Sequence, residues 1–160
     1  MLRIRILPTL LFINLFLFLF SHAAFAAPQT TTQSVAGDWV TFDSKTKKPS
    51  SVIQISQKGP VFSGKIIKTF SVPVEKKADV CTSCHGNQKN KPIIGLEIIK
   101  NMVCNDNGYC HQGTITDPRD GRVYHATLQL IKGGTYLKVH GYVGIALFGK
   151  TVVWKRFATQ

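Results

Sequence analysis

Short runs of alternating hydrophobic and polar residues follow one another between residues 37 and 157, and turn-forming residues separate them. The clear runs are 37–42, 51–57, 60–70, 122–131, 135–143 and 151–157, and two weaker ones are 92–101 and 113–116. A period of two with many β-branched side chains indicates β-strands that bury one face. No run keeps a helical period for three turns. The pattern therefore predicts an all-β domain of about eight strands.

Except for residues 71–91 and 102–112, the connections between these runs have eight residues or fewer, which favours antiparallel pairing of strands that are neighbours in sequence. The strongest turn signals are Lys58-Gly59, the Asp-Pro-Arg-Asp-Gly sequence at 117–121, and Lys132-Gly133-Gly134. Eight such strands suit a small closed barrel, because closure removes the edges that invite aggregation. Alternation then assigns to the interior Ile53, Ile55, Tyr124, Ala126, Leu128, Leu130, Leu137 and Val139.

The first 26 residues differ in character from the rest of the chain. Arg3 and Arg5 precede an apolar run over residues 6–20, and the segment ends in small residues at Ala26. This order of basic, apolar and small residues is typical of a secretory signal peptide, here with cleavage after Ala26. The run is short for a membrane span, which needs about 20 residues, so an uncleaved anchor is disfavoured.

Cleavage leaves a Thr- and Gln-rich segment, 27–36, which we expect to be a flexible lead-in, followed by one barrel domain over 37–158. The mature chain of 160 − 26 = 134 residues is long enough for one hydrophobic core. No transmembrane segment is expected after signal cleavage. The expected location is the bacterial periplasm or the cell exterior.

The domain is strongly basic. The formal net charge of the chain is +12, and removal of Arg3 and Arg5 leaves +12 − 2 = +10. Such a charge suits a soluble basic surface, or attraction to anionic envelope material such as lipopolysaccharide, phospholipid headgroups or cell-wall polymers. Nucleic acid is not expected as a partner, because the protein is exported and has no basic and aromatic stacking motif.

Residues at the two ends of the domain resemble the arrangement found in lipocalins and other calycins. Trp39 lies in a Gly-x-Trp sequence on the first predicted strand, and Arg156 follows Trp154 on the last. In those families a first-strand tryptophan packs against a last-strand basic side chain. The resemblance implies a lipocalin-like barrel that Trp39 and Arg156 close at one end, with about 1 kcal/mol from the cation over the indole ring.

A longer series of motifs runs through the domain in a fixed order. It comprises Gly37-x-Trp39, Cys81-x-x-Cys84-x-Gly86, Lys91-Pro92-x-x-Gly95, Gly113-x-Ile115-x-Asp117-Pro118, Gly121-x-x-Tyr124, Leu137-x-Val139-x-Gly141-Tyr142, and Phe148-Gly149 through Trp154-x-Arg156. Together they resemble the bacterial secreted family catalogued as domain of unknown function 2147, over residues 37–157. The resemblance implies a small, exported, β-rich protein and no particular activity. His85 and His140 depart from the family pattern.

The sequence Cys81-Thr82-Ser83-Cys84-His85 is also compatible with covalent attachment of haem c. That cofactor needs two thiols, an adjacent histidine ligand and an apolar pocket. Against it, the common cytochrome c domain is helical, and His85 leads into the polar, helix-breaking residues 86–92. We expect no cofactor and keep covalent haem with His85 as the alternative.

Disulfides are the favoured interpretation of the four cysteines, which allow three pairings. Because the family resemblance covers Cys81 and Cys84 only, the simplest assignment joins these two and joins Cys104 to Cys110 across the turn sequence 105–109. Pairing between the two sets stays open. A zinc site is disfavoured by the five residues between the second pair and by export. A redox-active dithiol is the lesser alternative to a structural disulfide, since no βαβ pattern surrounds it.

Two further patterns resemble functional sites, a phosphate-binding loop and a metal-binding pair of histidines, but we interpret both as structural. Residues 144–151 match the phosphate-loop formula, but that site needs a helix after the loop, and strand-like residues follow here. We interpret them as a turn between the last two strands. His125 and His140 are expected on the polar faces of neighbouring strands as surface residues, with a metal pair as the alternative.

The eight acidic residues form no evident acid and base pair, so no catalytic residue is assigned. We expect a non-enzymatic binding or envelope-associated protein that takes a small apolar or amphipathic ligand or an anionic envelope component. The alternative is a redox protein that uses the Cys81, Cys84 and His85 motif. The candidates for ligand contacts are Tyr124, Leu128, Leu137, Tyr142 and Phe148.

Overall fold

The computed structural model describes residues 33–70 and 80–157, and the predicted signal peptide lies outside these ranges. The described residues form eight strands and one short 3-10 helix. The strands are β1 (Gly37–Phe42), β2 (Pro49–Lys58), β3 (Val61–Thr69), β4 (Glu97–Cys104), β5 (Tyr109–Thr116), β6 (Val123–Ile131), β7 (Tyr136–Tyr142) and β8 (Gly149–Arg156), and the helix is η1 (Gly86–Gln88). No helix in the described ranges is long and apolar enough to cross a membrane.

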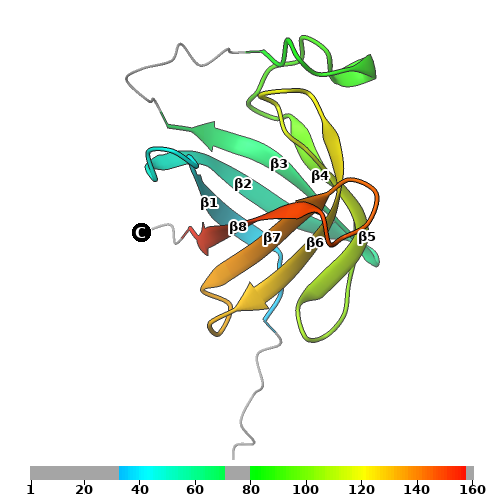
Figure 1. The fold of residues 1–160 in the computed structure, drawn as a ribbon. Helices are drawn as coiled ribbons and strands as arrows, with labels where there is room; N and C mark the ends of the chain where they lie inside the picture. Colours follow the sequence, from blue (N-terminus) through cyan, green and yellow to red (C-terminus); the bar gives the residue numbers. More distant parts are fainter. Residues whose placement is uncertain (1–32, 71–79, 158–160) are drawn as a thin grey trace, which may run out of the picture. The chain divides into compact units, whose positions relative to one another are not determined.

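The strands form a closed antiparallel barrel in sequence order, as predicted (Figure 1). Closure is made by a short pairing of the first and last strands, in which Trp39 lies opposite Arg156 and Val40 opposite Lys155. Because the order is up and down, successive connections alternate between the two ends. The upper end is defined here by the β1–β2, β3–β4, β5–β6 and β7–β8 connections. The lower end carries the other three hairpins and residues 33–36.

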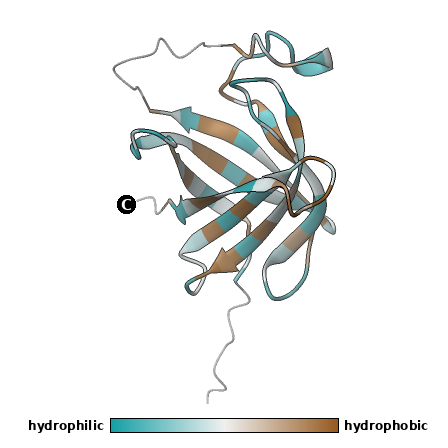
Figure 2. Ribbon diagram, viewed as in Figure 1, coloured by the Kyte–Doolittle hydropathy of each residue, from teal (hydrophilic) through white to brown (hydrophobic). Residues whose placement is uncertain are grey.

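Hydrophobic side chains form the core inside the barrel. Figure 2 shows hydrophobic and hydrophilic residues alternating along the strands. Most of the predicted interior positions are confirmed as core: Ile53, Ile55, Ala126, Leu128, Leu137 and Val139 are each 2 % exposed or less. Tyr124 and Leu130 are only half-buried. The other strands contribute Trp39, Ile99, Met102 and Trp154 to the same core.

The two weaker strand predictions have the wrong boundaries. β4 begins at Glu97 rather than at 92, because the preceding residues form a turn in which Gly95 has a φ of +90° and the Leu96 amide donates to the Ile93 carbonyl at 3.2 Å. β5 begins at Tyr109 rather than at 113. Its alternation is interrupted near Gln112, whose φ is +63°, where the pairing with β6 shifts register.

Candidate functional site

The Cys81–Cys84 disulfide forms part of the closure of the upper end. Both cysteines are 1 % exposed and belong to the hydrophobic core. The Cys81 sulfur lies 3.5 Å from the Pro118 carbonyl oxygen. A Cβ placed on Gly121 would overlap the carbonyl of Ser83. The loop of residues 81–84, here called the cysteine loop, therefore packs closely against the turn at 117–121 that joins β5 to β6.

The second disulfide joins Cys104 to Cys110 across the β4–β5 hairpin at the lower end. The two disulfides are separated by the length of β5, which begins next to one and ends at the turn that contacts the other. Pairing between the two sets does not occur, and the four sulfurs cannot surround one zinc ion. Within 33–70 and 80–157, no group of three or more His, Cys, Asp or Glu side chains could hold a metal.

The arrangement of Cys81, Cys84 and His85 does not fit covalent haem. Attachment would need both sulfurs at the wall of an apolar pocket with the histidine facing the iron. Here the sulfurs are bonded to each other and buried, while the His85 side chain is exposed. A dithiol exchange reaction meets the same obstacle, because an attacking thiolate needs access to a sulfur.

An exposed ion pair lies on the turn beside the cysteine loop. Arg119 donates from Nη2 to Asp117 at 2.6 Å, and the Arg119 backbone amide donates to the same carboxylate at 3.0 Å. Burial alone would raise the pKa of Asp117, but the side-chain and backbone hydrogen bonds from Arg119 and its charge lower the pKa overall. The turn is thus held by a carboxylate whose bonds from Arg119 are strongest when it is ionised.

This pKa shift predicts a dependence of stability on pH. A carboxyl with a lowered pKa stabilises the fold above its ordinary pKa of 3.8 and loses that contribution as the pH falls through the folded-state value. Asp117→Asn should therefore lower the free energy of unfolding at neutral pH, and the difference from the parent should shrink below about pH 4. Denaturant unfolding at a series of pH values measures it, with Asp106→Asn as the control. A difference that is the same at every pH would contradict the assignment.

At the lower end, Arg156 lies over the ring of Trp39, with its guanidinium carbon 4.2 Å from the ring centroid. It donates to the carbonyls of Ser34 at 2.9 Å, Ala36 at 3.1 Å and Gly134 at 2.8 Å. The Trp39 indole nitrogen donates to the Val35 carbonyl at 2.9 Å. Val35 is 1 % exposed, so the last four residues of the expected flexible lead-in pack against the barrel instead of extending from it.

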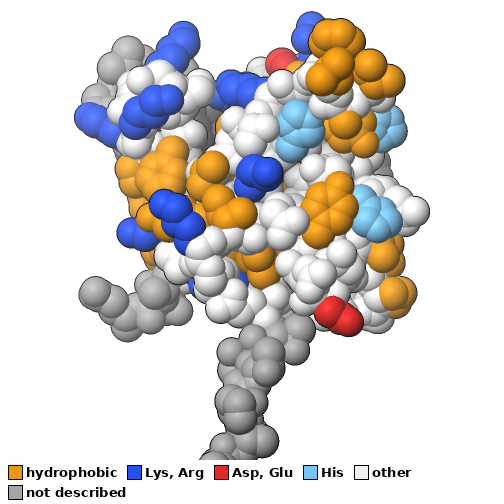
Figure 3. Space-filling view, turned by 60° about the horizontal axis from the view of Figure 1, so that its bottom comes forward, with side chains coloured by type: hydrophobic (Ala, Val, Ile, Leu, Met, Phe, Trp, Pro, Cys, Tyr) orange, Lys and Arg blue, Asp and Glu red, His pale blue; other side chains and the backbone are white. Residues whose placement is uncertain are grey.

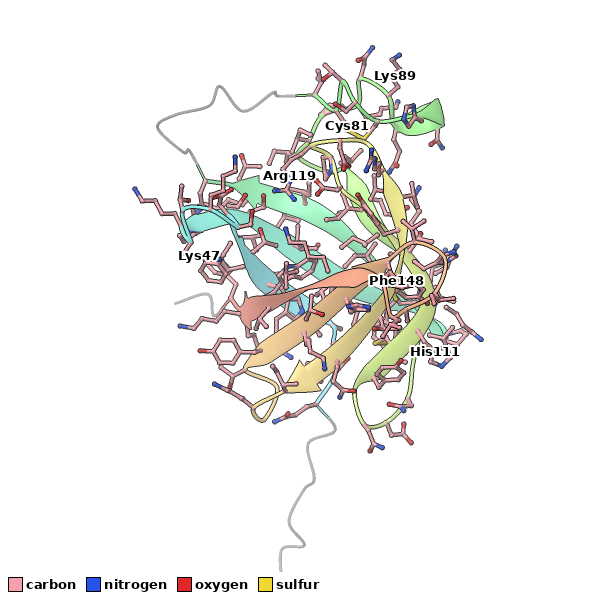
Figure 4. All side chains as sticks on the ribbon, viewed as in Figure 1. Lys47, Cys81, Lys89, His111, Arg119 and Phe148 are labelled. Atoms are coloured by element: carbon pink, nitrogen blue, oxygen red, sulfur yellow. A yellow bond between two sulfur atoms is a disulfide. The ribbon has the colours of Figure 1, made fainter. Side chains whose placement is uncertain are left out.

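The five residues expected to contact a ligand do not form one site. Leu128 and Leu137 are fully buried in the core, and Tyr124 donates a hydrogen bond to Asp120 at 3.1 Å near the upper end. Tyr142 lies on the outer surface against two histidines, and Phe148 is 72 % exposed in the β7–β8 connection (Figure 4). Alternation identifies the faces of a strand, but it does not bring these side chains together.

Two open cavities lie at the surface of the described part of the chain. One, of about 290 Å³, lies beside the β3–β4 connection and is lined by residues between Asn87 and Lys100. The other, of about 360 Å³, lies at the lower end between residues 33–35 and the tips of two hairpins. Neither is lined by the central interior residues Ile53, Leu128 and Leu137. Both are near the lower limit of size for a small-molecule site.

The outer face of β6 to β8 carries a group of aromatic rings beneath an apolar loop. The Tyr142 ring centroid lies 5.6 Å from that of His125 and 5.7 Å from that of His140. His125 pairs across the strands with Tyr142, not with His140, so the two histidines flank the tyrosine. Beyond them, residues 143–148 form the β7–β8 connection, here called the apolar loop. A strand, not a helix, follows it, as expected for a turn.

The apolar loop is held to the barrel by His140. Its Nε2 lies 2.8 Å from the Ala146 carbonyl, which can only accept, so Nε2 is the donor. Its Nδ1 lies 2.9 Å from the Thr151 hydroxyl. A Cβ on Gly149 would come within 2.5 Å of the His140 ring, so the ring covers the start of β8. The run of residues 143–148 without a polar side chain is the sequence feature that could have identified this loop as a contact surface. The interpretation as a turn took no account of it.

Comparisons with known proteins agree with the barrel. The family model described as "Uncharacterized protein conserved in bacteria (DUF2147)" matches residues 37–156, from β1 to the end of β8. No curated protein matches the chain. A solved structure titled "Protein HP1028 from the human pathogen Helicobacter pylori belongs to the lipocalin family" is similar, with a TM-score of 0.64 and 18 % identity, over 77 % of this chain and 82 % of that one. At this identity the likeness shows the fold, which is lipocalin-like.

Proposed function

Because the chain belongs to the DUF2147 family and its own side chains fill its barrel, we propose that it is an exported, non-enzymatic binding protein that meets anionic components of the bacterial envelope through its basic exterior. The filled interior carries this proposal. Leu128 and Leu137 are 0 % exposed, and an internal ligand would have to displace side chains that are already close-packed.

The distribution of charge supports an exterior site. Residues 121–160, which include β6, β7 and β8, contain six Lys and Arg and no Asp or Glu. Arg122, Lys132, Lys138, Lys150 and Lys155 are all exposed. Two carboxylates of the β5–β6 turn lie near this stretch, since Tyr124 donates to Asp120 and the charge of Lys150 acts on Asp117, but the six cations outnumber them. An excess of positive charge attracts polyanions and anionic lipid surfaces over roughly one Debye length, about 8–10 Å at physiological salt.

Two disulfides support an oxidising compartment, since disulfides persist in exported proteins and are rare in the cytosol. A periplasmic or secreted protein meets lipopolysaccharide, anionic phospholipid and cell-wall polymers before any other polyanion. We do not propose a redox function, because both sulfurs of the Cys81–Cys84 pair are buried under the 117–121 turn.

The proposal is tested by binding of residues 27–160 to lipid vesicles. This form contains every described strand and both disulfides, so it contains the whole folded barrel. We expect it to sediment with vesicles of mixed phosphatidylglycerol and phosphatidylcholine and not with phosphatidylcholine alone. Raising the salt from about 50 mM to about 300 mM should weaken binding tenfold or more, because the charges are screened. Binding that ignores both lipid charge and salt would refute the proposal.

A matched pair of double variants locates the binding surface. Lys138→Glu with Lys155→Glu reverses two exposed charges on β7 and β8. Lys58→Glu with Lys65→Glu reverses two exposed charges on β2 and β3 and serves as the control. The first pair should reduce the affinity for anionic vesicles more than the second, although both change the net charge equally.

A further inference from the structure

We propose that the apolar loop, residues 143–148, inserts into the outer layer of an anionic phospholipid bilayer. This inference rests on the proposed function and names the bilayer, among the anionic envelope components, as the partner. The loop consists of Val143, Gly144, Ile145, Ala146, Leu147 and Phe148, without a polar side chain. Its four large members are exposed: Val143 by 65 %, Ile145 by 61 %, Leu147 by 81 % and Phe148 by 72 %.

The loop holds this exposed conformation through defined contacts. The Phe148 amide donates to the Ile145 carbonyl at 3.2 Å, which closes a turn within the loop. His140 fixes the same turn through the Ala146 carbonyl. With the backbone held in this way, the large side chains project together, and Figure 3 shows hydrophobic side chains gathered at one corner of the molecule with histidines beside them. Apolar patches of this kind are often functional.

The size and form of the loop favour a bilayer over a protein partner. Four large side chains make an apolar patch of the size found on typical monomers, about 300–600 Å², whereas a stable protein interface buries about 800 Å² on each partner. The loop is a projection and not a groove, so it suits a soft apolar phase that adapts its shape. Binding at the boundary between headgroups and acyl chains strengthens with the apolar area that is buried and with the attraction of basic residues to anionic lipids.

The neighbours of the loop match an anionic interface. Lys150 is exposed two residues after Phe148, and its charge also acts on Asp117 of the β5–β6 turn. Tyr142 precedes the loop directly and stacks against His140. Tyrosine is enriched at the level of lipid headgroups, because its ring is apolar and its hydroxyl is polar. A tyrosine ring, the apolar loop and a lysine therefore follow one another along the chain from Tyr142 to Lys150.

The test compares binding of residues 27–160 and two variants to vesicles of mixed phosphatidylglycerol and phosphatidylcholine. Leu147→Ser with Phe148→Ser removes the two most exposed apolar side chains of the loop. Ile94→Ser removes an apolar side chain that is 52 % exposed in the β3–β4 connection and is the control. The double variant should lose at least about tenfold in affinity, because that apolar area no longer leaves water. The control should bind as the parent does. All three should melt at similar temperatures, since the replaced side chains are exposed.

Insertion is read directly with Leu147→Trp. Trp39 and Trp154 are 0 % and 5 % exposed, so they give a nearly constant background. On binding, the new indole should shift its emission to shorter wavelength and be quenched by lipids brominated on the acyl chain. If the parent binds anionic vesicles but the double variant binds equally and the indole is not quenched, the inference is overturned and the proposed function stands. If the parent does not bind at all, the proposed function fails. Dimerisation in solution that the double variant abolishes would assign the loop to a second copy and also overturn the inference.

Discussion

Gly121→Ala is expected to lower the free energy of unfolding by roughly 3 kcal/mol or more, which is a large effect for one methyl group. Two causes add. The φ of Gly121 is +73°, a left-handed conformation that costs an L-residue about 1–2 kcal/mol. The new Cβ would also overlap the backbone carbonyl of Ser83, which cannot move aside by changing a rotamer. The cysteine loop and the 117–121 turn must separate to admit the methyl group.

Gly59→Ala separates the two causes. Gly59 lies in the β2–β3 turn with a φ of +60°, and a Cβ there meets nothing within 4 Å. It should therefore cost only the backbone component, roughly 1 kcal/mol. Urea unfolding of both variants with their disulfides intact measures the difference. In Gly121→Ala the Cys81–Cys84 disulfide should also be reduced faster, because the 117–121 turn no longer packs against it. Equal stability losses in the two variants would show that the loop and turn are not in close contact.

The barrel could be predicted because its strands follow simple alternation and its turns contain strong signals. β1 was predicted at its observed limits, Gly37–Phe42. β4 was misplaced because Ile93 and Ile94 continue an apolar run that local pattern cannot distinguish from a strand. What sets the start of β4 is the turn at residues 93–96, in which Gly95 has a positive φ. The hydrogen bonds that Ile66 of β3 makes with Gly95 and Leu96 hold this turn against β3, so its place depends on the tertiary fold.

The place of a binding site was harder to predict, because it too depends on contacts between residues far apart in the sequence. Alternation shows that Leu128 and Leu137 face inward, but whether they line a cavity or fill the barrel depends on the volumes of all the interior side chains together. The apolar loop was interpreted correctly as a connection, yet its exposure depends on the contact of His140 with Ala146 across the β7–β8 connection. By contrast, Trp39 and Arg156 could be paired from the sequence, because both follow a recurrent motif at the ends of the domain.

Arg156→Met should lower the free energy of unfolding by roughly 2–4 kcal/mol, because it removes three hydrogen bonds from a charged donor, each worth about 1 kcal/mol, and the stacking on Trp39. Burial lowers the pKa of Arg156, but an arginine stays charged at any pH at which the protein folds. Arg156→Lys should recover only part of the loss. An ammonium on a flexible stem cannot reproduce the planar guanidinium that spans the Ser34, Ala36 and Gly134 carbonyls.

Lys155→Met is the matched control, since it removes the same charge from the neighbouring position of β8, where the side chain is exposed. It should change stability by no more than about 0.5 kcal/mol. Hydrogen exchange provides the second measurement. In Arg156→Met the amides near Val35 should exchange faster, because the carbonyls of Ser34 and Ala36 lose the partner that holds this segment on the barrel. Unchanged exchange there, together with a stability loss, would mean that Arg156 acts through the Trp39 ring and the Gly134 carbonyl and does not hold residues 33–36 over the lower end.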